Sequence, residues 1–137
     1  MAVVKEVTLA LTGAVAIAAG LVVYALFRPA RIPLIPSALH LADASAGAPA
    51  VLGAVPSVDH AFAMPLLTAA CLQSRRRNIV MGCLAWGVVD VVFELGQRTG
   101  IRFFPGGTFD PLDLSGVLLG TTLAGAVGLA IMRGQSR

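Results

Sequence analysis

The chain has 137 residues, enough for one domain, of which 57% are hydrophobic and only 12% charged. Ordinary soluble domains contain about 25% charged residues, and a mean hydropathy of +0.86 likewise points to lipid as the solvent. The net charge of +3 comes from Lys and Arg in short clusters between apolar runs, without interleaved aromatic residues, so nucleic acid is not an expected partner.

The first expected element is a membrane-spanning helix over residues 7–27, a run without a charged side chain. At about 1.5 Å per residue, this run can cross a hydrocarbon core about 30 Å thick. It is longer than the apolar part of a secretory signal and ends at Arg28-Pro29 without a small-residue cleavage site, so we expect it to be retained. Several prolines exclude one long helix over residues 29–56, but residues 37–46 could form a short interfacial helix.

Three further spans are expected at residues 57–73, 79–97 and 111–132. The first of these carries Pro65, which a membrane helix tolerates when neighbouring groups satisfy the freed carbonyl. The expected fold is therefore all-α: a single transmembrane domain over residues 1–137, with four transmembrane helices and a short interfacial helix between the first and second.

The basic residues predict the orientation of these spans. With four spans, both termini share a side with the arginine-rich loop, and this side collects Lys5, Arg75, Arg76, Arg77, Arg133 and Arg137. The other side collects Arg28, Arg31, Arg98 and Arg102. Because cytoplasmic loops carry an excess of Lys and Arg, we expect a multi-pass protein of the cell membrane with both termini cytoplasmic.

Small residues line one face of the last expected span. They recur every four residues, which permits close approach of another helix: Gly116, Gly120, Ala124 and Gly128. The first span offers a matching row of alanines: Ala10, Ala14 and Ala18. Packing within the chain is the favoured interpretation of these rows, and a homo-oligomer through the small-residue face is the alternative. The two cysteines, Cys71 and Cys83, are expected to be small packing residues.

The third expected span carries an acidic face. At 100° per residue, Asp90, Glu94 and Gln97 fall within about 60° of one another. A carboxylate in mid-span, such as that of Asp90, costs about 2.5 to 3.5 kcal/mol, so it should face the bundle interior and find a partner or a proton. This cost favours a functional role for Asp90. Glu94 precedes Arg98 by four residues, so it could equally form a simple helical ion pair.

Further polar groups occur at the starts of the second and fourth spans. Asp110 before Pro111 is typical of a helix N-cap, and Asp113 can bond back to that cap. Ser57 and Asp59 could cap the second span in the same way. His60 is neither a common cap nor an apolar packer, although a lone histidine is more often a hydrogen-bonded structural residue than a functional one. All these helix ends share one membrane face, so the following side chains could converge on one pocket: Asp59, His60, Glu94, Gln97, Asp110 and Asp113.

Two short motifs resemble the C-terminal half of VanZ-like membrane proteins. They are Glu94-Leu95-Gly96-Gln97, and Phe109-Asp110-Pro111-Leu112-Asp113 followed by Gly120. The family tends to carry E-x-x-Q at the end of one membrane helix and F-D-x-x-D at the start of the next. An Asp and a His at an upstream helix start are also reminiscent of the family, and here they are Asp59 and His60.

The resemblance covers roughly residues 57–125 and has two departures. Gly107 stands where the family usually has Arg, and Val117 stands where it often has Asn, although Arg102 could replace the missing Arg. The resemblance implies a role in the cell envelope and an association with resistance to the glycopeptide antibiotic teicoplanin.

The favoured functional hypothesis is a polar pocket at the extracytoplasmic interface that binds or processes an envelope component, such as a lipid-linked or cell-wall precursor. Glu94, Asp90 and His60 would then act as general acid–base groups. The residues expected to bind the substrate are Gln97, Asp59, Asp110, Asp113 and Arg102. Carboxylates could also hold a divalent cation, so a metal or other cofactor is left open.

Two alternatives belong to other classes of protein. One is a small proton- or cation-coupled transporter that uses Asp90 and Glu94 as carriers. The other is a non-catalytic accessory or packing subunit in which the acidic groups are only caps and ion pairs. In each case, membrane lipid is an expected partner.

Overall fold

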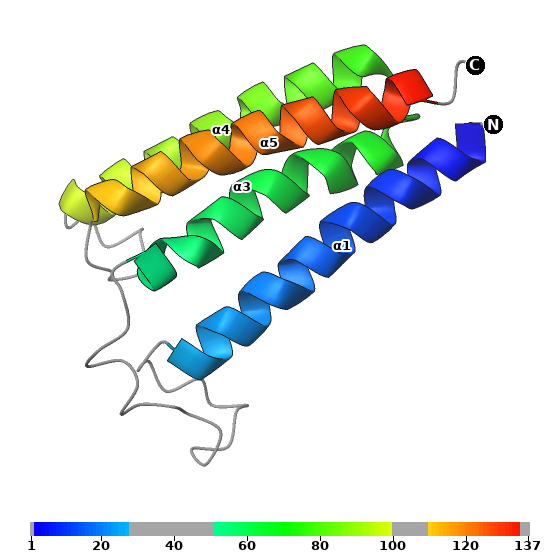
Figure 1. Cartoon of the computed structure of the whole chain (residues 1–137). Coiled ribbons are helices and arrows are strands. Elements are labelled where there is room, and N and C mark those ends of the chain that lie inside the picture. The colour runs from blue at the N-terminus through cyan, green and yellow to red at the C-terminus, as the bar shows by residue number, and fades with distance from the viewer. Residues whose placement is uncertain (1, 28–50, 100–109, 135–137) are drawn as a thin grey trace.

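The computed structural model describes residues 2–27, 51–99 and 110–134, which form four α-helices (Figure 1). They are α1 (Ala2–Phe27), α3 (Val51–Cys71), α4 (Arg76–Thr99) and α5 (Pro111–Gly134). No strand occurs in these ranges, so the predicted all-α class is confirmed. The interfacial helix predicted at residues 37–46 lies outside the described residues.

The helices α1, α3 and α4 begin earlier than predicted. α3 starts at Val51 and contains Pro56, which the sequence interpretation had assigned to the preceding connection. Pro56 lies in the second turn of α3, where it removes only the one hydrogen bond that its missing amide would donate, and a helix packed against neighbours tolerates this loss. α4 likewise includes Arg76 and Arg77 in its first turn, because arginine is a good helix former.

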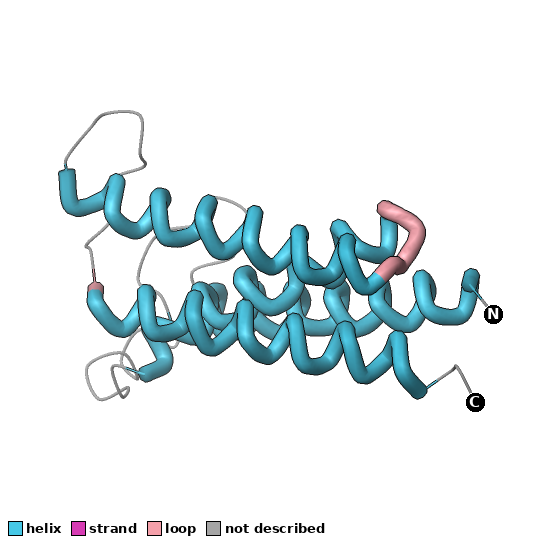
Figure 2. Tube along the Cα trace, turned by 90° about the horizontal axis from the view of Figure 1, so that it is seen from above, coloured by secondary structure: helices cyan, strands magenta, loops and turns pink. Residues whose placement is uncertain are grey.

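The central helix of the bundle is α3. It packs against α1 on one side and against α5 and α4 on the other, while α1 has only a small contact with α5. The start of α1, the end of α5 and the turn at residues 72–75 lie together at what we call the turn end (Figures 1 and 2). At the opposite end, α3 and α5 begin and α4 ends, which is the arrangement that the predicted pocket requires.

Hydrogen bonds close the turn end. Gln73 has a left-handed backbone (φ 65°), and the next amide, that of Ser74, donates to the carbonyl of Ala69 at 2.9 Å. This arrangement satisfies one of the carbonyls that a helix leaves open at its C-terminus. Lys5 Nζ donates to the carbonyl of Met132 at 3.3 Å, so a cation also lies at the C-terminal end of α5, as the helix dipole favours.

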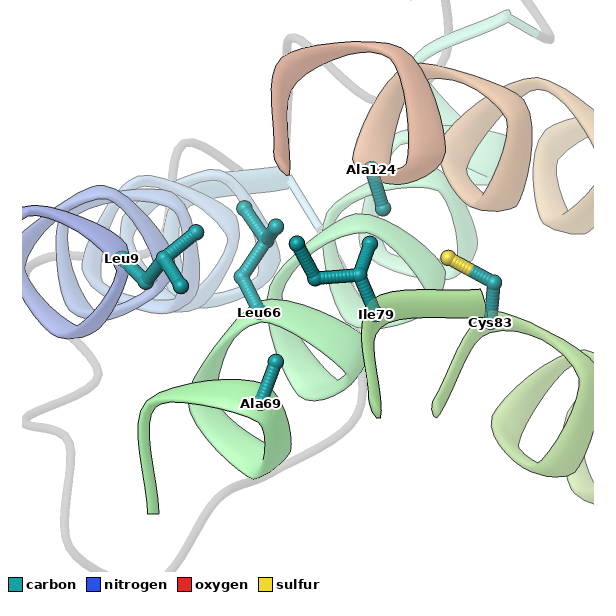
Figure 3. Packing of buried hydrophobic residues seen from close by; sticks show 6 residues of the cluster. All are labelled: Leu9, Leu66, Ala69, Ile79, Cys83 and Ala124. Atoms are coloured by element: carbon teal, nitrogen blue, oxygen red, sulfur yellow. The ribbon is translucent and has the colours of Figure 1, made fainter. Parts of the chain in front are cut away.

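The interior contains mainly small residues, and the large aliphatic side chains point outward. The buried apolar cluster takes residues from all four helices, with Leu9, Leu66 and Ile79 as its largest members (Figure 3). Leu84 and Leu118, by contrast, are 60% and 68% exposed. Small residues inside and large apolar ones outside are typical of helices that pack in lipid, where close backbone approach replaces hydrophobic burial.

Among the helices that the structure describes, three are long and apolar enough to cross a membrane. The segments are Val3–Val23, Arg76–Thr99 and Pro111–Gly134. Together with the outward-facing aliphatic surface, they indicate a membrane protein.

The small-residue face of α5 packs within the chain, as the sequence favoured. A Cβ added to Gly116 would lie 3.2 Å from the carbonyl oxygen of Ala54, and one added to Gly120 would overlap that of Val58. This face is therefore covered by α3 and is not exposed to a second copy of the chain.

The prediction that a row of alanines forms the packing face of α1 is wrong. Ala14 and Ala18 are exposed, and α1 instead turns two glycines toward α3. A Cβ on Gly13 would lie 2.8 Å from Leu67 Cγ, and one on Gly20 would lie 2.7 Å from an oxygen of Asp59. Alanine spacing alone did not reveal which stripe of this uniformly apolar helix meets a neighbour.

Candidate functional site

Polar side chains of α3 and α4 meet near the middle of both helices. His60 Nδ1 lies 3.0 Å from Asp90 Oδ1. Asp90 is buried, with 8% of its surface exposed, whereas the side chain of His60 is 45% exposed. The carboxylate that the sequence placed in mid-span thus has a partner on the neighbouring helix, which reduces the cost of holding it there.

The pairing determines how the imidazole can exchange protons. If Asp90 is ionised, its Oδ1 can only accept a hydrogen bond, and Nδ1 of His60 then carries the proton and donates to it. Nε2 is then the nitrogen that can take up a further proton. The second carboxylate oxygen, Asp90 Oδ2, is buried and has no hydrogen-bond partner among the described residues.

An aromatic contact holds the histidine ring in place. The Trp86 indole lies edge-on to the His60 ring, with a centroid distance of 5.7 Å and an interplanar angle of 83°. Trp86 is itself fixed, because its Nε1 donates to Thr68 Oγ1 at 2.8 Å. The sequence interpretation missed this residue, since a tryptophan within an apolar run carries no signal of a site.

A cavity of about 380 Å³ opens at the His60–Asp90 pair. α3 contributes Ser57 and His60, α5 contributes Val117, and α4 contributes the remaining lining residues: Val89, Asp90, Phe93 and Glu94. Asp90 and Glu94 are both 8% exposed and lie one turn apart on the same face of α4, as predicted. The cavity therefore has two buried carboxylates and a histidine within an otherwise mainly apolar wall.

Hydrogen bonds connect the cavity to the start of α5. The Ser57 hydroxyl donates to Asp113 Oδ1 at 3.1 Å. The prediction that Ser57 and Asp59 cap their helix is wrong, because α3 begins at Val51 and both residues lie inside it. Asp110 does act as a cap: its Oδ1 accepts from the amide of Leu112 at 2.9 Å.

Some predicted members of the pocket lie elsewhere. Asp59 faces Gly20 of α1, because adjacent residues on a helix point about 100° apart and His60 faces α4. Gln97 is partly buried but does not line the cavity. Arg102 lies outside the described residues.

The arrangement suits proton exchange and the acceptance of hydrogen bonds. Within residues 2–27, 51–99 and 110–134, no group of three or more His, Cys, Asp or Glu side chains is placed to hold a metal ion. The two cysteines are free: Cys83 belongs to the buried cluster, as expected, whereas Cys71 is exposed.

Comparisons of this chain with protein-family models, curated proteins and solved structures gave no match.

Proposed function

We propose that this chain crosses the cell membrane four times and uses the His60–Asp90–Glu94 cavity as an acid–base site for an envelope component, such as a lipid-linked or cell-wall precursor. The observation that carries the proposal is the 3.0 Å contact between His60 Nδ1 and Asp90 Oδ1 in the wall of a 380 Å³ cavity. The resemblance to VanZ-like proteins supplies the substrate class and the link to teicoplanin. Val117, where the family often has Asn, lines the same cavity.

The course of the chain supports four spans. α1 and α4 both run from the turn end to the opposite end, so α3 must bring the chain back between them (Figure 1). α3 has 21 residues, and at 1.5 Å per residue a helix of this length covers about 30 Å, the thickness of a hydrocarbon core. Each polar residue of α3 named here contacts a neighbouring helix, as a membrane-spanning helix requires. Asp59 lies against α1, His60 against α4 and Ser57 against α5.

The arginines of the turn end support a cytoplasmic location for that end. The cavity extends from the middle of the bundle toward the end opposite the turn end. Glu94 lies near the end of α4 there, and Asp113 lies in the first turn of α5. In this orientation the cavity faces the extracytoplasmic leaflet, where envelope precursors are processed.

Cysteine labelling in intact cells tests this orientation. In a Cys71→Ser background, a cysteine introduced between positions 102 and 107 should react with an impermeant maleimide added from outside. The parent chain provides the matched control, because exposed Cys71 adjoins the turn end and should react only after permeabilisation. The opposite labelling pattern would reverse the orientation and move the cavity to the cytoplasmic leaflet.

The proposed chemistry is reversible proton transfer. Nε2 of His60 removes a proton from a hydroxyl or amine of the bound group, and the negative charge of Asp90 stabilises the imidazolium that forms. The proton then returns from Nε2 to the bound group, which restores the neutral imidazole. Glu94 accepts a hydrogen bond from the ligand and holds it against the imidazole. General acid–base catalysis of this kind contributes about 10²- to 10⁴-fold in rate.

A second candidate function is proton translocation, which the position of the pair near the middle of α3 and α4 favours. Reconstitution into liposomes that contain the pH dye pyranine separates the two candidates. A pH gradient that decays faster with the parent chain than with Asp90→Asn would favour the transporter, whereas equal decay would favour the acid–base site.

Expression in a teicoplanin-susceptible Gram-positive bacterium tests the proposed function in cells. The parent chain should raise the minimum inhibitory concentration of teicoplanin, and His60→Gln should return it to that of cells with the empty vector. Thr122→Val is the matched control, because this exposed hydroxyl only bonds back to Leu118 of its own helix. An unchanged inhibitory concentration with the parent chain, or full resistance with His60→Gln, would contradict the proposal.

A further inference from the structure

Basic side chains gather at the turn end of the bundle. Among the residues that the structure describes, five lie there: Lys5, Arg75, Arg76, Arg77 and Arg133. Glu6 is the acidic residue described at the same end. Arg76 and Arg77 are exposed and begin α4, where the positive end of the helix dipole adds to their charge. The turn end therefore attracts anions.

An apolar stripe runs along the outer face of α4 from these arginines. Met81, Leu84 and Val88 follow Arg77 by four, seven and eleven residues, so all of them lie on one face of the helix. All three apolar side chains are exposed. The stripe thus offers an acyl chain a continuous path that starts beside a cation.

The stripe borders a groove of about 330 Å³ between α4 and α5. Leu84 of α4 and Leu118 of α5 belong to its wall, and Gly87 leaves room between them. A Cβ built on Gly87 would meet the Thr121 side chain at 3.5 and 3.6 Å, which is ordinary van der Waals contact. The groove lies on the α5 side of α4, whereas His60 contacts α4 from α3.

The spacing of the arginines and the groove suits one phospholipid. One leaflet of a hydrocarbon core about 30 Å thick spans about 15 Å, which equals about ten residues of helix. Arg77 and Gly87 are ten residues apart in α4. A lipid whose phosphate lies at Arg76 and Arg77 would therefore have an acyl chain beside Leu84 and Gly87.

A lipid complements this surface better than a second copy of the chain does. All copies in one membrane share an orientation, so a second copy in the groove would bring its own arginines to the same leaflet. Like charges repel one another, whereas a lipid phosphate offsets them. A zwitterionic lipid also brings a cation, so a headgroup with a net negative charge is the better complement.

From the arginines, the exposed stripe and the groove together, we infer that α4 and α5 bind one phospholipid of net negative charge. Its phosphate lies at Arg76 and Arg77, and one of its acyl chains lies in the groove beside Gly87. This lipid site is distinct from the acid–base cavity and does not depend on the function proposed for that cavity.

Native mass spectrometry of the full chain, released from detergent micelles, counts individual bound lipids. Dioleoylphosphatidylglycerol and dioleoylphosphatidylcholine carry the same acyl chains and differ in net charge. We expect the first phosphatidylglycerol to bind about fivefold more tightly than the first phosphatidylcholine, the effect of one cation near the membrane surface.

Two pairs of variants separate the headgroup contact from the groove. Replacing both Arg76 and Arg77 with glutamine should abolish the preference for phosphatidylglycerol, whereas replacing both with lysine should keep it. Gly87→Leu fills the groove and should weaken the binding of both lipids, with Gly87→Ala as a milder variant should the first fail to fold. Ala14→Leu adds similar bulk to the exposed face of α1 and should change neither affinity.

Three outcomes would overturn the inference. The parent chain could bind both lipids equally, or its preference could survive the double glutamine variant. Unchanged lipid binding in folded Gly87→Leu would exclude an acyl chain from the groove. A dimer of the parent chain that Gly87→Leu converts to a monomer would instead assign the groove to a second copy.

Discussion

Replacing Gly120 with leucine is expected to lower the free energy of unfolding by about 3 kcal/mol or more. A Cβ at this position would overlap the carbonyl oxygen of Val58, and it would also lie 3.0 Å from the Cβ of Ala61 and 3.1 Å from the backbone nitrogen of Phe62. Backbone atoms of a packed helix cannot rotate out of the way as the end of a flexible side chain can. α5 would therefore have to move off α3. Unfolding in mixed detergent, followed by circular dichroism, measures the effect.

Two smaller substitutions separate close packing from a general effect of glycine. Gly120→Ala should cost about 1 to 3 kcal/mol, because even one methyl group meets the Val58 backbone. Gly53→Ala is the matched control, because nothing lies within 4 Å of a Cβ built there. It should leave stability unchanged or raise it by up to about 1 kcal/mol through better helix propensity. Equal effects at the two positions would contradict the packing described for α5.

Under the proposed function, replacing Asp90 with asparagine should abolish the teicoplanin resistance proposed for the parent chain while the protein stays folded. Asparagine keeps the shape of the side chain and can still hydrogen-bond to His60, so α3 and α4 remain joined. It removes the negative charge that stabilises the imidazolium, and this should reduce the rate of the proposed chemistry by about 10²-fold or more. The inhibitory concentration of teicoplanin and the thermal unfolding of the purified variant in detergent are the two measurements.

Glu94→Gln provides the companion test, because Glu94 lines the same cavity one turn nearer the end of α4. It should also lose resistance with folding nearly intact. If Glu94 served only in a helical ion pair, its loss would cost a few tenths of a kcal/mol of stability and leave resistance untouched. Full resistance in Glu94→Gln would make α4 a structural helix and contradict its role in the site.

The sequence predicted the helices well because their signal is local. Long apolar runs identified all four, and the 100° period placed Asp90 and Glu94 on one buried face. Helix starts were less predictable, since a proline such as Pro56 can interrupt a helix or sit near its beginning. The sequence alone offers no means to separate these cases, because the packing of α3 against its neighbours decides between them.

The pairing of the site residues depended on helix rotation, which local patterns do not encode. Asp59 and His60 are adjacent in sequence, yet one faces α1 and the other α4. Close contacts fix that rotation: a Cβ at Gly82 of α4 would lie 3.2 Å from the carbonyl oxygen of Pro65 in α3. Two turns farther along α4, Asp90 then meets His60.

The most direct test of the central claim is the protonation of the His60 ring in the folded protein. The sequence has two histidines, so a His40→Gln variant with ¹⁵N-labelled histidine reports on His60 alone in lipid nanodiscs. At mildly alkaline pH, nitrogen chemical shifts should show a proton on Nδ1 and none on Nε2, and Asp90→Asn should change this distribution. A proton on Nε2, or nitrogen shifts that Asp90→Asn leaves unchanged, would contradict a His60–Asp90 pair poised for acid–base chemistry.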